Sequence, residues 1–280
     1  MIKFALVSTK GGVGKTTIAA NLGGLLADMG LRVLMVDADV QPSLSKYYPL
    51  IHRARLGLLD VVTRGTVTSA AISQTSIPNL DLIVSDAIEG QLQLWLANQL
   101  DRDIRFKNAL RSPRVADHYD CVLIDTQGAV GALQEAAALA ADELISPIIP
   151  EVLSAREFKD GTMALLQRLA GAREAVGPVR ALINRMDRTR DAAAIVAALR
   201  ADDQRSAHHV TVLDLVIPGA KAYKEASTLR LPVHRHEASR RGSSPCAYEV
   251  MHQLAWSVIP ALCLPTKRFA PRPRPQRVCA

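Results

Sequence analysis

The feature that most constrains the fold of this 280-residue chain is a glycine-rich segment near its N-terminus, Ser8-Thr9-Lys10-Gly11-Gly12-Val13-Gly14-Lys15-Thr16-Thr17. The segment follows an apolar run, residues 2–8, that is typical of a strand, and it precedes a helical pattern over 16–29 that Gly30 closes. A strand, a glycine-rich loop and a helix in this order wrap backbone N–H groups around a phosphate chain. The sequence therefore predicts a phosphate-binding loop.

Apolar runs and helical patterns alternate along the rest of the chain. Further strands are expected at 32–37, 80–85, 121–125, 144–149, 179–184 and 210–217, and further helices at 91–100, 132–141, 155–170 and 191–199. Because the runs are apolar almost throughout, the strands are expected to be buried on both faces. This pattern predicts a doubly wound α/β fold with a mostly parallel sheet, which with the loop makes a P-loop NTPase.

We expect one ATPase-sized domain over residues 1–264, because neither a repeat nor a Gly/Ser linker interrupts it. Residues 265–280, PTKRFAPRPRPQRVCA, are rich in Pro and Arg and are expected to form a disordered basic tail. The N-terminal apolar run is too short for a signal-peptide core, and apolar runs elsewhere fall short of the ~18 residues of a membrane helix. A cytoplasmic location without a membrane partner is therefore expected.

The net charge of +7 is concentrated at the C-terminal end. Residues 219–280 carry 11 basic and 3 acidic side chains, whereas residues 1–218 are nearly neutral. A polyanionic partner would explain this asymmetry, and so would a solvated basic surface. Since only 4% of residues are aromatic, stacking on single strands is disfavoured and the backbone of duplex DNA is the expected partner. The candidate phosphate contacts are Arg230, Arg235, Arg240 and Arg241.

Three residues have the chemistry of a nucleotide site. Lys15 ends the loop and would reach the β- and γ-phosphates, while the hydroxyl of Thr16 would bind Mg²⁺. Asp125 follows the apolar run 121–124, so it would bring a carboxylate to the carboxyl edge of the sheet, where it can hold Mg²⁺ through water.

The loop contains a second lysine, Lys10, and lacks the glycine of the ordinary pattern at Thr9. The resulting KGGVGKT segment resembles the deviant Walker A loop of the ParA/MinD family of partition and positioning ATPases, and the resemblance extends from residue 2 to about 260. It implies ATP and Mg²⁺ as cofactors. It also implies that Lys10 reaches across an ATP-sandwich homodimer to the phosphates bound by the partner, as an arginine finger would. The nucleotide-binding residues implied within the loop are Lys10, Gly11, Gly12, Val13, Gly14, Lys15, Thr16 and Thr17.

The resemblance assigns further residues outside the loop. Asp37 to Gln41 resemble the first switch, in which Asp37 would lie near the metal and Asp39 would orient the attacking water, although an Asp at a strand end is also a common helix cap. Lys10, Lys15 and Asp39 are thus the implied catalytic residues. Asn184 stands where the family reads the adenine edge, and otherwise would be a turn residue; Pro218 begins the last loop on the nucleotide side.

Two departures from the family pattern lie in the switches. Val40 and Gln127 stand where many relatives have proline, and both are expected to alter switch rigidity, while Gly128 would let the second switch move. The Asp-Thr-Gln-Gly sequence that includes Gln127 is similar to ParA-type proteins of integrative and conjugative elements.

The resemblance implies a slow DNA-partition ATPase that binds duplex DNA non-specifically as an ATP-dependent dimer, with hydrolysis stimulated by a ParB-type centromere-binding protein. Two alternatives stay open: a MinD-like adaptor that positions a protein complex without a DNA role, and a metabolic P-loop enzyme. Residues 126–141 contain no cysteine for the iron–sulfur cluster of a nitrogenase iron protein. His208, His209, His234 and His236 are expected at the surface rather than as metal ligands.

Overall fold

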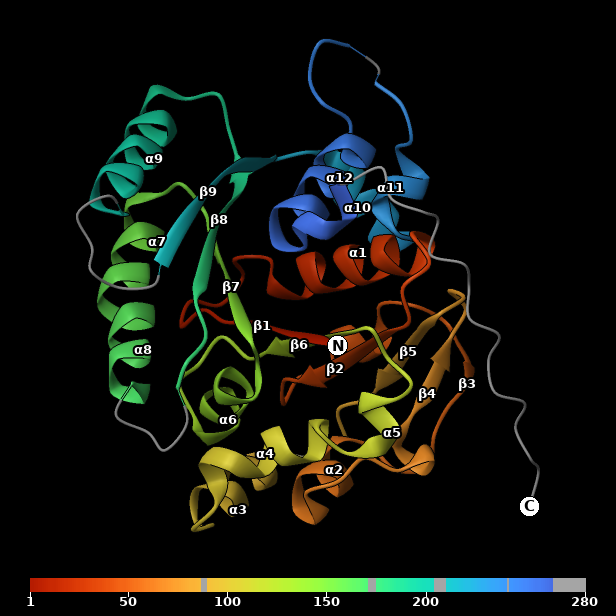
Figure 1. Ribbon diagram of the computed structural model, residues 1–280. Coiled ribbons are helices and arrows are strands. Elements are labelled where there is room, and N and C mark those ends of the chain that lie inside the picture. The colour runs from red at the N-terminus through yellow and green to blue at the C-terminus, as the bar shows by residue number, and fades with distance from the viewer. Residues whose placement is uncertain (87–89, 171–174, 204–209, 241, 264–280) are drawn as a thin grey trace.

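The computed structural model describes residues 1–86, 90–170, 175–203, 210–240 and 242–263. Across these residues the chain forms a nine-stranded sheet with helices on both faces (Figure 1). The predicted α/β fold is confirmed. The predicted basic tail, Arg241 and the pair His208 and His209 lie outside the described residues.

The sheet contains every strand predicted from the sequence. Its strands are β1 (Ile2–Leu6), β2 (Val33–Ala38), β3 (Leu50–His52), β4 (Ser73–Thr75), β5 (Leu80–Ile83), β6 (Cys121–Thr126), β7 (Glu143–Ile148), β8 (Val179–Met186) and β9 (Val210–Pro218). The spatial order is β3-β4-β5-β2-β6-β1-β7-β8-β9. All pairs are parallel except those of β4 with β3 and β5. The carboxyl ends of the central parallel strands therefore meet at one edge.

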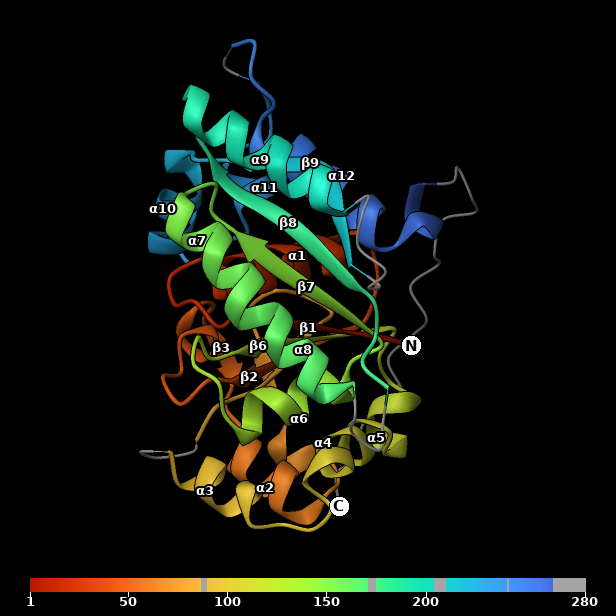
Figure 2. The same cartoon turned by 90° about the vertical axis from the view of Figure 1, so that its left-hand side faces the viewer.

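Helices cover both faces of this sheet. They are α1 (Lys15–Asp28), α2 (Leu58–Arg64), α3 (Gln91–Ala97), α4 (Arg102–Leu110), α5 (Pro113–Ala116), α6 (Ala132–Ala140), α7 (Val152–Glu157), α8 (Met163–Leu169), α9 (Arg190–Asp203), α10 (Lys221–Thr228), α11 (Val233–His236) and α12 (Ala247–Val258). Helices α1, α10, α11 and α12 share one face, and α2 to α6 cover the other (Figure 1). Figure 2 shows α7, α8 and α9 beside β7, β8 and β9.

Helix α1, which follows the glycine-rich loop, packs between the sheet and α12. Gly23 and Gly24 make this packing possible. A Cβ on Gly23 would lie 3.1 Å from the Met35 sulfur, and one on Gly24 would lie 2.8 Å from Cγ of Pro232. At such separations a methyl group would have to displace its neighbours. Close packing on both sides thus fixes the helix that follows the phosphate-binding loop.

Three local expectations need correction. The antiparallel strands β3 and β4 were not predicted, because three polar or mixed residues carry little periodicity. The expected helix over 155–170 begins earlier, at Val152, and a π-helical turn, Phe158–Thr162, separates α7 from α8. His234 was expected at the surface, but it is 5% exposed, because α11 packs it against the end of α1.

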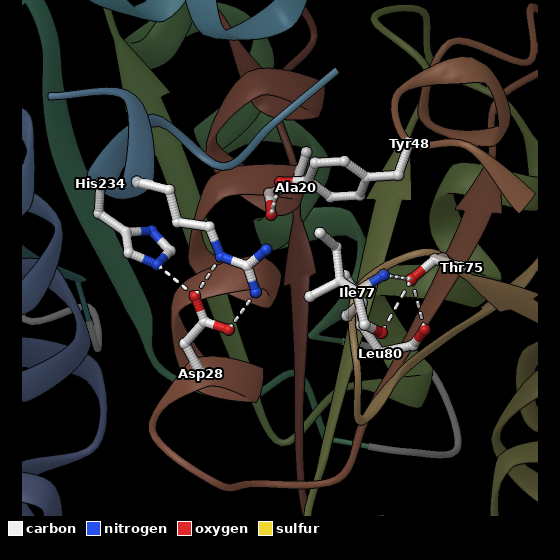
Figure 3. Close-up of polar contacts among 8 residues, drawn as sticks. Ala20, Asp28, Tyr48, Thr75, Ile77, Leu80 and His234 are labelled. Atoms are coloured by element: carbon white, nitrogen blue, oxygen red, sulfur yellow. Dashed lines mark hydrogen bonds and ion pairs between the residues drawn. The ribbon is translucent and has the colours of Figure 1, made fainter. Parts of the chain in front are cut away.

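The turn between β4 and β5 is closed by a side chain as well as by the backbone. The Thr75 hydroxyl donates to the Leu80 carbonyl at 2.7 Å and accepts from the Ile77 N–H at 3.1 Å (Figure 3).

Among the described residues, helices with the length and apolar character needed to cross a bilayer are absent.

Candidate functional site

The glycine-rich loop connects β1 to α1 at the carboxyl edge of the sheet. Gly12 and Gly14 have φ values of 75° and 98°, in the left-handed region that favours glycine. A Cβ on Gly14 would also lie 2.4 Å from Nδ2 of Asn184. Helix α1 starts directly after Gly14, with neither a side-chain cap nor an acidic residue in its first turn. Its first N–H groups are therefore available to an anion.

Lys15 is buried under the loop. Its Nζ donates to the carbonyl oxygens of Ser8 and Lys10, both at 3.4 Å. Burial lowers the pKa of Lys15, while the carboxylates of Asp125 and Asp39 oppose this effect. A lysine held among carbonyls beside two acidic groups is placed to move onto phosphate oxygens when they arrive.

Asp125 is the second-to-last residue of β6 and is fully buried. Neither of its carboxylate oxygens makes a hydrogen bond of good geometry within the described part of the chain. Burial raises its pKa to about 8, and the nearby Thr16 hydroxyl is the group that most favours the carboxylate. Unsatisfied buried carboxylate oxygens beside a threonine hydroxyl match the hard oxygen ligands of Mg²⁺. The residues present thus fit a magnesium ion.

Asp37 is the second-to-last residue of β2, beside Asp125 on β6, and its oxygens already accept hydrogen bonds. Its Oδ2 accepts from the N–H and the hydroxyl of Ser45, at 2.7 and 2.6 Å, and its Oδ1 accepts from the Asp39 N–H at 3.3 Å. Burial raises the pKa of Asp37 to about 6 despite these hydrogen bonds. Asp37 therefore anchors the segment after β2 and lies beside the predicted metal site.

Ser45 and Ser85 were missed in the sequence, and both fix the segment around Asp39. The Ser45 hydroxyl accepts from the Ser85 N–H at 2.9 Å, and the Ser85 hydroxyl donates to the Asp39 carbonyl at 2.6 Å. Asp39 itself is partly exposed, and its Oδ1 accepts from the Gln41 N–H at 2.9 Å. Isolated serines carry no sequence pattern, so only the structure could reveal them.

A cavity of about 900 Å³ opens beside the loop. Asn184 and Pro218, which the sequence assigned to the nucleotide, both line it together with Gly14 and Thr17. Asn184 is 6% exposed, and its Nδ2 donates to the Val13 carbonyl at 2.7 Å. The amide nitrogen is therefore used to hold the loop, which leaves the amide oxygen for a ligand.

The segment after Asp125 touches the loop directly. A Cβ on Gly128 would lie 2.8 Å from Cα of Gly11, so this position requires glycine for close approach. Gln134, on α6, donates to the carbonyls of Ser8 and Gln127 at 3.1 Å each. The side chain of Gln127 accepts from Gln93 of α3 at 2.7 Å. Neither Gln93 nor Gln134 had a signal in the sequence.

Lys10 lies at the head of the loop, where its side chain is 29% exposed. Its Nζ lies 3.8 Å from Oε2 of Glu151, whose side chain is 65% exposed. An exposed pair at this separation contributes little to stability. Lys10 is therefore free to exchange Glu151 for another anion.

The described candidate DNA contacts each have a partner within the chain. Arg230 donates to the carbonyls of Lys46 and Tyr48 at 3.1 Å, and Arg240 donates to both carboxylate oxygens of Glu249. Arg235 forms a bidentate pair with Asp28.

Asp28 joins this pair to the buried His234. It also lies 2.8 Å from Nε2 of His234 (Figure 3). Together, Arg235 and His234 lower the pKa of Asp28 to about 2, in spite of partial burial. The network ties the end of α1 to α11.

A parallel sheet that ends in a phosphate-binding loop, with a buried lysine and an unsatisfied carboxylate beside a threonine hydroxyl, defines a P-loop nucleoside triphosphatase. A family model described as AAA domain matches residues 1–176. The chromosome partitioning protein ParA of Caulobacter vibrioides is 32% identical over 240 residues, which cover 85% of this chain and 88% of that protein. This chain belongs to the ParA/MinD family of P-loop ATPases.

Solved structures show the same fold. The ATP complex of McdA from Cyanothece superposes with a TM-score of 0.79 at 22% identity, over 95% of this chain and 98% of that one. The septum site-determining protein MinD of Pyrococcus horikoshii, complexed with Mg-ADP, gives a TM-score of 0.66 at 23% identity, over 92% and 95% of the two chains. The expected family and fold are thus confirmed.

Proposed function

We propose that this chain is a ParA-type ATPase that partitions a plasmid, a chromosome or a mobile element. The observation that carries the proposal is Lys10, a second lysine at the head of the phosphate-binding loop that is partly exposed and only weakly paired. The similarity to ParA over most of both chains supports it. The ATPase domain that we propose spans residues 1–264, with 265–280 as a basic tail.

The nucleotide would bind along the loop from Lys10 to Thr17. Backbone N–H groups of the loop and Lys15 would hold the phosphates, and Asn184 and Pro218 would hold the base in the adjoining cavity. Thr16 and Asp125 would hold Mg²⁺, and Asp37 would add negative charge close by. Bound there, Mg²⁺ would neutralise the negative charge that develops on the phosphate oxygens.

Asp39 would orient the water that attacks the γ-phosphate. The Ser85 hydroxyl holds its backbone carbonyl. Its partly exposed carboxylate accepts a hydrogen bond from the Gln41 N–H. Since positioning supplies most of the catalysis in phosphoryl transfer, slow basal turnover is expected until a partner orders this segment. We propose a ParB-type centromere-binding protein as that partner.

Lys10 would leave Glu151 and reach the phosphates bound by a second copy of the chain. The exchange is favourable because a triphosphate carries more negative charge than one exposed carboxylate. ATP occupancy would then be coupled to dimerisation, and Lys10 would stabilise transition-state charge in trans.

Duplex DNA would bind non-specifically to the basic C-terminal region of the ATP-bound dimer. Arg240 is the best described candidate, because its pair with Glu249 is exposed and phosphates can compete for it. Arg230 and Arg235 are engaged more deeply, by backbone carbonyls and by Asp28. The protein would thus be a cytoplasmic, nucleoid-associated ATPase.

A MinD-like positioning adaptor without a DNA role is the second candidate. It is favoured by one observation: Arg230, Arg235 and Arg240 all have acceptors within the chain. The two functions differ in whether DNA is needed.

Co-sedimentation with non-specific duplex DNA tests the proposal, with ATP or ADP, across a salt series, for the wild type and Lys10→Ala. We expect binding that requires ATP, weakens steeply with salt and is lost in the variant. Binding that is absent, or equal in ATP and ADP, would overturn the DNA-partition function and leave the adaptor.

A further inference from the structure

The residue that precedes Lys10 is held by the helical segment that follows β7, the strand next to β1 in the sheet. The Thr9 hydroxyl donates to Oε1 of Glu157 at 2.6 Å and lies 3.2 Å from the Thr162 hydroxyl. The Thr9 N–H also donates to the Thr162 hydroxyl oxygen at 3.2 Å. Both the backbone and the side chain of Thr9 are thus bonded to the junction of α7 and α8.

This junction is the π-helical turn Phe158–Thr162, where the predicted continuous helix is interrupted. Gly161 lies inside the turn at the contact. A Cβ there would lie 2.1 Å from Oε1 of Glu157 and 2.4 Å from Oγ1 of Thr9. Thr162 is fully buried, so its hydroxyl is fixed by packing. π-Helical turns are rare, and they are frequently found at functional sites.

The contact acts on one half of the loop. The other half is anchored elsewhere: the Val13 carbonyl is bonded to Asn184, and Lys15 begins α1. Thr9 is bonded to the junction of α7 and α8, and Lys10 meets Glu151 just before Val152 begins α7. The π-helical turn therefore holds the Thr9 end of the loop, while Asn184 holds the Val13 end.

We propose that Glu157 and Thr162 are positioning residues for Lys10, because they fix the backbone of Thr9 through its hydroxyl and its N–H. The proposal rests on the proposed role of Lys10 in the ATP-bound dimer. We call the group Thr9, Glu157, Gly161 and Thr162 the Thr9 clamp. The clamp sets the direction in which the Lys10 side chain leaves the loop, and a displacement of about 1 Å at such a site costs up to about 100-fold in rate.

The hydrogen bonds of the Thr9 clamp can be removed by substitutions that change the shape of the side chains very little. Thr9→Val keeps the shape of the side chain but removes the hydroxyl, so Glu157 loses its hydrogen-bond donor. Thr9→Ser keeps the hydroxyl. Glu157→Leu removes the acceptor, whereas Glu157→Gln retains an oxygen that can accept. Thr63→Val is a matched control, since the Thr63 hydroxyl donates to carbonyls of its own helix α2.

The test measures ATP affinity with a fluorescent ATP analogue, ATP-dependent dimerisation by light scattering, and ATP turnover. We expect Thr9→Val and Glu157→Leu to lower dimerisation and turnover about tenfold, with ATP affinity changed by less than about twofold. Thr9→Ser, Glu157→Gln and Thr63→Val should stay close to the wild type. Gly161→Ala should act like Thr9→Val, because its Cβ occupies the place of the Glu157 carboxylate.

A double-mutant cycle with Lys10→Ala distinguishes positioning from a general structural role. If the clamp acts through Lys10, adding Thr9→Val to Lys10→Ala causes no further loss in dimerisation or turnover. Additive losses, or a parallel loss of ATP affinity, would overturn the clamp and leave the proposed function standing. If Lys10→Ala itself changes neither dimerisation nor turnover, the trans role of Lys10 fails, and the clamp fails with it. Thermal unfolding of each variant identifies those that do not fold, and the remaining variants decide.

Discussion

Asp37 and Asp125 are direct register partners on the neighbouring parallel strands β2 and β6, and both side chains are fully buried. Two carboxylates at one level of a sheet repel each other when both are ionised. The Ser45 hydroxyl donates a hydrogen bond to the Asp37 carboxylate, whereas the carboxylate oxygens of Asp125 lack a hydrogen-bond donor of this kind among the described residues. Asp125 is thus the carboxylate that most requires a cation.

The first prediction concerns the ligand-free stability of Asp125→Asn. The folded-state pKa of Asp125 is raised to about 8, above its unfolded value, so the folded state binds this proton more tightly. The free energy of unfolding should therefore decrease as pH rises from about 4 to about 8. Asn removes the charge, so the variant should be more stable than the wild type at pH 8, on the order of 2 kcal/mol.

Thermal unfolding in EDTA between pH 5 and pH 8 measures this difference. The gap between the two proteins should shrink toward pH 5, where the wild-type carboxyl is protonated. An Asn variant that is less stable than the wild type at pH 8 would contradict the assignment. Added Mg-ATP should stabilise the wild type and not the variant.

The second prediction concerns the ion pair between Asp28 and Arg235. Asp28→Asn should lower the free energy of unfolding at pH 7 by roughly 1 to 2 kcal/mol, because it breaks a partly exposed bidentate pair and a contact with His234. The folded-state pKa of Asp28 is lowered to about 2. The stability that its carboxylate contributes is therefore complete above about pH 4 and is lost as the pH falls from about 4 to about 2. Urea unfolding at pH 7, 5 and 3 should show a constant gap down to pH 5 and a smaller one at pH 3.

The third prediction separates two arginines of the basic region. Arg240→Gln should weaken DNA binding and reduce the slope of log affinity against log salt by about 1, with stability nearly unchanged, because Arg240 is exposed. Arg235→Gln should lower the free energy of unfolding and leave DNA affinity nearly unchanged, because the guanidinium of Arg235 is engaged by Asp28. Equal salt slopes for Arg240→Gln and the wild type would exclude Arg240 from the DNA contact. Fluorescence anisotropy with a labelled duplex measures both slopes.

The fourth prediction concerns the contact between the second switch and the loop. Gly128→Ala places a methyl carbon 2.8 Å from Cα of Gly11, so one of the two segments must move away. ATP affinity should fall at least about tenfold, the effect of misplacing phosphate-binding N–H groups. Gly242→Ala is the matched control, since nothing lies within 4 Å of its added Cβ and it should bind ATP as the wild type does. Isothermal titration with ATP and Mg²⁺ compares the three proteins.

The central part of the fold could be predicted because its signals are local. Strand β6 begins with a run of four apolar residues from Cys121, and Gly30 closes α1 with a φ of 93°. The loop was identifiable for the same reason, since its glycines, lysines and threonines are consecutive. The short strands β3 and β4 and the buried position of His234 escaped prediction because other segments of the chain determine them.

The sequence by itself determined the class of site, a glycine-rich phosphate-binding loop with two lysines, and it predicted Thr16 and Asp125 as oxygen ligands beside that loop. Contacts between residues far apart in the chain were decided only by the tertiary structure. Thr9 and Glu157 are 148 residues apart, and Asn184 reaches the loop across 171 residues. Such hydrogen bonds form because the carboxyl ends of β1, β7 and β8 meet at one edge of the sheet. A local sequence pattern does not encode which distant strands become neighbours. Consecutive residues therefore specify what the loop can bind, while distant ones specify how it is held.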